Sequence, residues 1–153
     1  MVMLIMEIGI TSKIKNEAVY YFVNWSCLSK AERYDIIYKV PEVAGVYEIY
    51  WMDENKHLRL FIVGKTDYSG LRTEIRNITD PELCYNDKKA KKILEEKEIW
   101  YRYSTTNSSM SMDDVIWFFM NEYFPEKTDV RHSGRYKDIF LKESTPDKLL
   151  WVE

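Results

Sequence analysis

The chain has 153 residues, of which 46% are hydrophobic and 31% are charged, with only 5 glycines and 4 prolines. This length suits one domain with a sizeable core, and the composition excludes a disordered or low-complexity protein. The formal net charge is −3. Dedicated nucleic-acid modules usually carry a basic excess, so the overall balance argues mildly against tight DNA binding but leaves a local basic face open.

The cysteines and histidines of the chain indicate neither a metal centre nor a disulfide scaffold. Cys27 and Cys84 have no metal-ligand spacing, and His57 and His132 lack companion histidines or cysteines. The apolar run at residues 1–7 has no basic region before it and is too short to span a membrane. We therefore expect a soluble, cytoplasmic protein without a membrane partner.

The first 40 residues contain three candidate elements. Residues 2–10 are mostly apolar and predict an edge strand, whereas residues 18–25 fit either a strand or a buried helix. Ser29 and Glu32 have the spacing of a capping box, which predicts a helix over about 30–38 that ends before Pro41.

The middle of the chain predicts a hairpin followed by two helices. Strands are expected at about 45–52 and 58–64, because both runs are apolar and the polar residues 53–56 between them favour a turn. Leu71, Ile75 and Ile78 fall on one side of a helix over 71–78. A charged helix over 86–97 begins at Asn86 or Asp87.

The last third adds a strand, a helix and a less regular tail. Residues 99–103 predict a third strand, and a helix that begins near Ser111 and ends before Pro125 is apolar nearly all round, so we expect it to be buried. Residues 139–141 and 149–152 are short candidate elements. The order predicts one α+β domain with a small three-stranded antiparallel sheet flanked by helices, plus N-terminal and C-terminal extensions.

Two tripeptides lie on the predicted hairpin, Gly45-Val46-Tyr47 on its first strand and Ile62-Val63-Gly64 on its second. This pair, with the lead-in Val40-Pro41, resembles the core of the GIY-YIG nuclease superfamily over about residues 40–130. Ile62 stands where the superfamily has its second tyrosine. Phe61 is one residue away, and a one-residue offset on a regular strand faces the opposite side.

The resemblance implies phosphodiester cleavage assisted by one divalent metal, with Mg²⁺ as the cofactor if the protein is active. It assigns Tyr47 to the site and Arg72 to the phosphate-binding arginine, although an insertion at residues 68–69 would place Glu74 there instead. Arg76 lies one helical turn from Arg72 and shares its face. No glutamate occupies the expected metal-ligand position, so Asp114 is the substitute candidate, and its alternative role is to complement the helix dipole.

Basic residues supply candidate nucleic-acid contacts. Lys65 follows the second tripeptide, and Arg131 and Arg135 lie in a segment that also contains a serine and a glycine. Lysines cluster on the charged helix, where we select Lys88, Lys89 and Lys92 as contacts. A solvated helix face and an ordinary surface loop are the alternatives for these two groups.

From these observations we expect that the protein binds or acts on nucleic acid, more readily DNA than RNA, and has weak or no endonuclease activity. An active Mg²⁺-dependent DNA endonuclease and a non-enzymatic protein-interaction module remain the alternatives. The second tyrosine and the glutamate that the resemblance implies are not matched in this chain. This favours the inactive form, since metal-assisted cleavage depends on its ligands.

Overall fold

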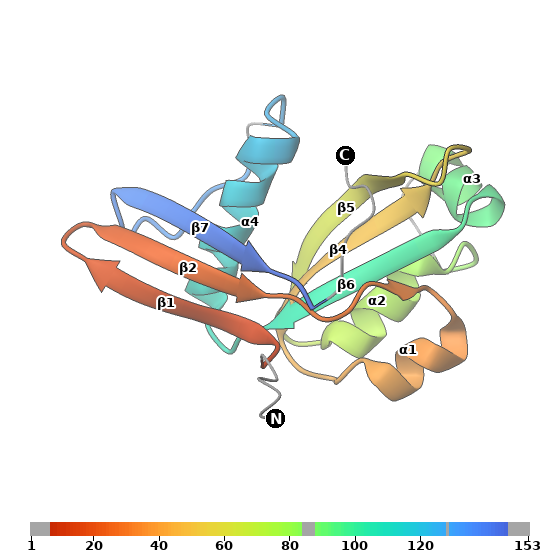
Figure 1. The fold of residues 1–153 in the computed structure, drawn as a ribbon, viewed down its shortest axis with the longest axis horizontal. Coiled ribbons are helices and arrows are strands. Elements are labelled where there is room, and N and C mark those ends of the chain that lie inside the picture. Colours follow the sequence, from red (N-terminus) through yellow and green to blue (C-terminus); the bar gives the residue numbers. More distant parts are fainter. Residues whose placement is uncertain (1–6, 84–87, 128, 147–153) are drawn as a thin grey trace.

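The structure, a computed structural model, describes residues 7–83, 88–127 and 129–146. Within these ranges the chain is α+β and has four helices and seven strands. Figure 1 shows how these elements are arranged. The strands are β1 (Gly9–Lys15), β2 (Ala18–Asn24), β3 (Ser29–Lys30), β4 (Gly45–Met52), β5 (Leu58–Thr66), β6 (Ile99–Thr105) and β7 (Asp138–Ser144). The helices are α1 (Arg33–Lys39), α2 (Leu71–Thr79), α3 (Lys88–Glu96) and α4 (Ser109–Tyr123).

The strands form two sheets rather than one three-stranded sheet. The antiparallel sheet has the order β3-β6-β4-β5, so the three expected strands form its centre and the two-residue β3 extends its edge. The mixed sheet has the order β1-β2-β7, with β1 antiparallel and β7 parallel to β2. The N-terminal and C-terminal extensions therefore combine into a second sheet.

Strand β4 organises the interior because both of its faces are covered. Tyr47 and Ile49 pack against residues of α1, α2 and α3, whereas Val46 packs against α4 and β2. Figure 1 shows α4 behind the mixed sheet, and α1 and α2 beside the antiparallel sheet. A strand covered on both faces is apolar almost throughout, and β4 has this composition.

For residues 18–25, the choice between a strand and a buried helix is decided by the strict alternation of buried and exposed side chains. Val19, Tyr21 and Val23 are buried, while Tyr20 and Phe22 between them are exposed. This period of two belongs to a strand with one covered face. Residues 139–141 likewise belong to a strand, β7, which pairs with β2.

One predicted helix start is wrong because the residues pair as a strand, and another is displaced by two residues. Ser29 and Lys30 pair with β6 as a strand, so α1 begins only at Arg33 and its N-cap residue Glu32 makes no side-chain cap hydrogen bond. The helix expected near Ser111 begins earlier. Its N-cap is Ser108, whose hydroxyl accepts a hydrogen bond from the Ser111 N–H at 3.1 Å.

The N-terminal strand is also shifted relative to its prediction. β1 begins at Gly9 and continues to Lys15, because a tight turn at Asn16 (φ 57°) folds it back onto β2. Residues 2–6, the helix start at 86–87, Cys84 and the candidate element at 149–152 lie outside the described residues. No helix in the described part of the chain is long and apolar enough to cross a membrane.

A β-bulge in β5 changes the expected facing of two residues. Ile49 pairs with Ile62 but the next residue, Tyr50, pairs with Leu60, so Phe61 is the extra residue. Because the bulge interrupts the alternation, Phe61 and Ile62 both pack against the core on the Tyr47 side. The expectation that they face opposite sides is therefore wrong.

Candidate functional site

Tyr47 lies in the interior, on the face of β4 that α1, α2 and α3 cover. Its side chain is 3% exposed, and its hydroxyl donates a hydrogen bond to Glu74 Oε1 at 2.9 Å. Burial, and then the Glu74 carboxylate, raise the pKa of Tyr47 well above its usual value. The phenol is therefore neutral and already paired with a carboxylate of α2.

Gly64, the last residue of the second tripeptide, has a packing role. It lies directly opposite Tyr47 in the ladder, and a Cβ atom at Gly64 would come within 2.3 Å of the Tyr47 hydroxyl oxygen. The tyrosine side chain therefore crosses the space that any larger residue at this position would fill. The glycine of one tripeptide and the tyrosine of the other thus form one packing unit.

The two candidate arginines of α2 differ in their surroundings. Arg72 donates a hydrogen bond from Nε to the backbone carbonyl of Val40 at 2.8 Å, which ties α2 to the end of α1. Arg76 lines a small cleft of about 180 Å³ together with Arg33 and Asp80, and its Nε has no partner among the described residues. Arg76 therefore retains a buried donor without a partner among the described residues.

Asp114 lies on the other side of the antiparallel sheet. Its carboxylate is fully buried and accepts hydrogen bonds from the Tyr21 hydroxyl at 2.5 Å and from the Ser133 N–H at 2.7 Å. The Arg135 guanidinium lies 3.7 Å from the same carboxylate. Both carboxylate oxygens are therefore engaged in joining α4 to β2 and to the loop before β7.

The arrangement gives Mg²⁺ no set of ligands. The cation prefers several oxygen ligands around an accessible position. Tyr47 and Asp114 point into different cores on opposite faces of β4, and no three His, Cys, Asp or Glu side chains in the described part of the chain are grouped to hold a metal. We therefore derive no metal-dependent step from these residues.

Three of the predicted phosphate contacts lie on the α4 side. Lys65 forms an ion pair with Asp113, the residue before Asp114. Arg135 stacks over Tyr136 and donates to the Tyr21 hydroxyl at 3.3 Å, so it is part of the Asp114 network. Arg131 is exposed and forms no ion pair with a described residue.

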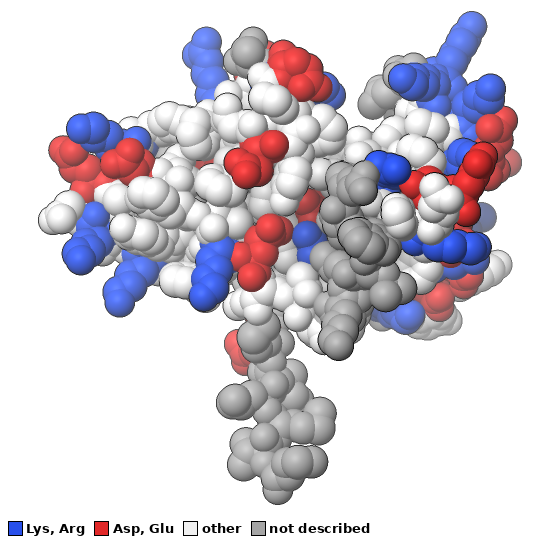
Figure 2. Space-filling view, turned by 45° about the horizontal axis from the view of Figure 1, so that its top comes forward, with Lys and Arg blue, Asp and Glu red and all other residues white. Residues whose placement is uncertain are grey.

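The lysines of α3 lie together on the surface. Lys88, Lys89, Lys91 and Lys92 are all exposed, whereas Leu94 faces the core. Figure 2 shows lysine and arginine side chains gathered at the end of the molecule where α3 lies, with acidic side chains beside them. We call these four residues the α3 lysine face.

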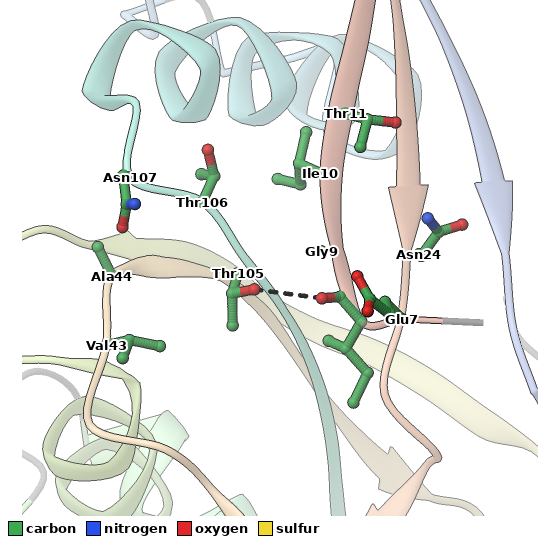
Figure 3. Close-up of a pocket in the computed structure, with 11 residues that line it drawn as sticks. Glu7, Gly9, Ile10, Thr11, Asn24, Val43, Ala44, Thr105, Thr106 and Asn107 are labelled. Atoms are coloured by element: carbon green, nitrogen blue, oxygen red, sulfur yellow. Dashed lines mark hydrogen bonds between the residues drawn. The ribbon is translucent and has the colours of Figure 1, made fainter. Parts of the chain in front are cut away.

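A pocket of about 560 Å³ lies at the junction of the two sheets, away from every predicted site residue. As Figure 3 shows, it is formed by the start of β1, the end of β6 and the segment before β4. Its polar lining consists mainly of Thr105, Thr106 and Asn24, and the Thr105 hydroxyl donates to the Ile8 carbonyl at 3.3 Å. Among the described residues Glu7 is the one ionisable residue that lines it, so the described lining contains no acid–base pair.

A buried ionic cluster between the two sheets was not predicted. Glu48 and Arg102 are paired across β4 and β6, and Glu48 Oε1 accepts from Arg102 Nε at 2.7 Å and from the Tyr50 hydroxyl at 2.7 Å. Glu143 of β7 accepts from Arg102 Nη2 at 3.3 Å and from the Trp25 indole N–H at 2.8 Å. A charge in the middle of each apolar strand is the sequence signal that would have found this pair.

The search of curated proteins found no match, and the search of solved structures found none either. A family model described as "Uncharacterised protein" matches residues 9–153, and the chain therefore belongs to this family.

Proposed function

We propose that the protein binds nucleic acid through the α3 lysine face and has little or no nuclease activity. The observation that carries the proposal is the concentration of four exposed lysines within five residues of one helix. Lys88 is three and four residues from Lys91 and Lys92, so like charges are neighbours on the helix surface and repel one another.

The order of charges along α3 adds to this argument. The lysines lie at the amino-terminal end of the helix and Glu95 and Glu96 at its carboxyl-terminal end, which is the reverse of what the helix dipole favours. Lys88, Lys91 and Lys92 form no ion pair with a described carboxylate. A polyanion such as a phosphate backbone relieves both the repulsion and the unfavourable dipole interaction.

The absence of efficient cleavage is supported by the separation of Tyr47 and Asp114. Each lies in its own buried hydrogen-bonded group, and β4 stands between them. The GIY-YIG resemblance is retained as part of the proposal, because the tripeptides on β4 and β5 are followed by α2 in the order that it implies. The same resemblance makes DNA the expected nucleic acid.

The binding part is tested by fluorescence anisotropy with a labelled DNA duplex at several salt concentrations. Changing all four lysines of the α3 lysine face to glutamine should weaken binding and reduce the salt slope by about 3 to 4, since each phosphate contact contributes roughly 0.9. A matched control changes four exposed lysines elsewhere to glutamine and alters the net charge equally. These are Lys30, Lys39, Lys56 and Lys127.

Equal losses in both variants would show nonspecific attraction and contradict a defined face. Failure of the wild-type protein to bind DNA or RNA at low salt would favour the protein-interaction module instead. For cleavage, plasmid DNA is incubated with the protein and Mg²⁺ or Mn²⁺. Efficient cutting that disappears in Tyr47→Phe and Asp114→Ala variants would overturn the inactive assignment and establish the nuclease.

A further inference from the structure

The outer face of the mixed sheet carries a group of exposed aromatic side chains. Tyr20 and Phe22 of β2 are each 39% exposed, and Phe140 of β7 is 47% exposed. The inward residues of β2, such as Val19 and Val23, already supply the core beneath the sheet. The outer aromatics are therefore not needed to bury this sheet against α4.

These aromatic residues are neighbours across the strands. Tyr20 lies directly opposite Phe140 in the parallel ladder, and their ring centroids are 5.0 Å apart with planes inclined by 17°. β7 is an edge strand, so no further strand among the described residues pairs with its outer side. Phe22 lies two residues along β2 and therefore projects from the same face. We call Tyr20, Phe22 and Phe140 the aromatic face.

Lysines border the aromatic face. Lys13 of β1 is the ladder partner of Tyr20, and Lys142 of β7 is the partner of Phe22. Lys15 lies two residues after Lys13 and projects from the same side, where Asp138 is the one acidic residue of the strands. Figure 2 shows lysine and arginine side chains along the mixed sheet, with acidic side chains and uncharged surface between them.

A hollow of about 480 Å³ adjoins the aromatic face at the β1–β2 turn. Tyr20 and Phe140 form one side of it, and Lys15 and Lys137 contribute cations. Glu17 and Asp138 also line the hollow, and their carboxylates offer acceptors of the kind that base amino groups donate to. Flat apolar rings, nearby cations and a polar recess thus occur together on one exposed surface.

We propose that the aromatic face binds single-stranded nucleic acid, with bases stacked on its rings and phosphates along Lys13, Lys15 and Lys142. Single strands expose the faces of their bases, whereas a duplex keeps them stacked inside, so this surface selects unpaired nucleotides. It is separate from the α3 lysine face, which contacts backbone phosphates. The two sites can therefore fail independently.

The charges also argue against a second copy of the chain as the occupant. In a twofold-symmetric dimer the same patch forms both sides of the interface. Such an interface would bring together two sets of the three lysines, six cations in all, against two copies each of Asp138 and Glu17, four carboxylates. A polyanionic strand, in contrast, complements this charge.

The test uses the full chain and fluorescence anisotropy with labelled oligothymidylate, labelled oligouridylate and a DNA duplex. Phe140→Ala and Tyr20→Ala should each weaken binding of the single strands by about fivefold or more, because a stacked base is typically worth at least that factor. Phe140→Trp should retain binding. Tyr38→Ala is the matched control, since Tyr38 is an exposed tyrosine of α1 that is remote from the mixed sheet.

A second measurement does not depend on variants that fold. Oligonucleotides carrying 5-bromouracil are crosslinked to the wild-type protein by ultraviolet light, and the modified peptides are identified by mass spectrometry. Crosslinks at Tyr20, Phe22 or Phe140 are expected. The thymidylate and uridylate arms show whether DNA or RNA is preferred.

Several results would overturn the inference. These are an absence of single-strand binding at low salt, equal affinities for Phe140→Ala and Tyr38→Ala, or crosslinks confined to α3. A dimer in sedimentation experiments that dissociates on Phe140→Ala would assign the face to a second copy instead. Loss of duplex binding on neutralising the α3 lysine face, together with unchanged single-strand binding, would support both sites.

Discussion

Buried polar groups are paired differently on the two faces of β4. On the face covered by α1, α2 and α3, the interior holds the Tyr47 hydroxyl with its single partner Glu74. On the opposite face, between the two sheets, Glu48 and Arg102 form an ion pair and Asp114 forms a separate hydrogen-bonded group. On the first face, side chains pack around a neutral phenol. On the second face, buried groups of opposite charge neutralise one another.

This difference places the residues that resemble a catalytic set in two separate surroundings. A nuclease needs its phosphate-binding, metal-binding and water-activating groups around one accessible point. Here the alternation of β4 sends Tyr47 to one core, and α4 carries Asp114 into the other. Each of these groups has a hydrogen-bond partner within its own core. Its contribution to stability is therefore sufficient to explain its position, without a catalytic role.

The comparison predicts its largest effect at Arg102. Changing Arg102 to methionine leaves Glu48 buried opposite an apolar side chain, and removing one partner of a buried ion pair typically costs about 3–5 kcal/mol. The expected result is a loss of that size in the free energy of unfolding, measured with urea. The double variant Arg102→Met with Glu48→Leu removes both charges and should recover most of the loss. A small loss in the single variant would show that the pair is solvated.

The second prediction concerns Asp114 on the same side of the sheet. Asp114→Ala leaves the Tyr21 hydroxyl and the Ser133 N–H without their acceptor, which should lower the free energy of unfolding by about 2–4 kcal/mol. Asp113→Ala is the matched control. Its ion pair with Lys65 is partly exposed, so its loss should cost less than about 1 kcal/mol. Equal effects of the two variants would contradict a structural role for Asp114.

How far the sequence predicts the molecule depends on how local each signal is. β4, β5, β6 and α2 follow from runs of apolar residues and nearby turn residues, and their predicted centres agree with the structure. The mixed sheet requires β7 to pair in parallel with β2, which is more than a hundred residues earlier. No local pattern specifies that pairing, so the extensions were not recognised as one sheet.

The candidate site was less predictable for the same reason. The identities of Tyr47 and Asp114 suggested catalysis, but their roles depend on Glu74 and Tyr21, which are distant in sequence. The bulge at Phe61 also alters which residues share a face, and bulges leave little trace in a short apolar strand. Residue types therefore suggest a chemistry, but the partners of these side chains are not specified by any local pattern.

A third prediction tests the packing role of Tyr47. Gly64→Ala forces the Tyr47 ring to move, and overpacking of this kind typically costs about 1–3 kcal/mol. The change is measured as a shift in the urea midpoint. Tyr47→Leu vacates the space above Gly64, so the alanine should cost much less in that background. If the two changes are additive, the ring and the glycine do not form one packing unit.

The smallest expected effect lies at the exposed turn between β4 and β5, where Asp53 provides a contrast to buried Glu48. The backbone N–H of His57 donates to Asp53 at 2.9 Å and, with Arg59, holds the pKa of this carboxyl below its usual value near 3.8, whereas burial raises the pKa of Glu48. A lowered pKa in the folded state means that ionised Asp53 stabilises the fold above that usual value. This contribution disappears as the pH falls through the folded-state pKa. Asp53→Asn should therefore be slightly less stable than the wild type at neutral pH and equally stable in acid. Urea unfolding at a series of pH values measures this difference, and a gap that persists in acid would show that the charge of Asp53 is not its cause.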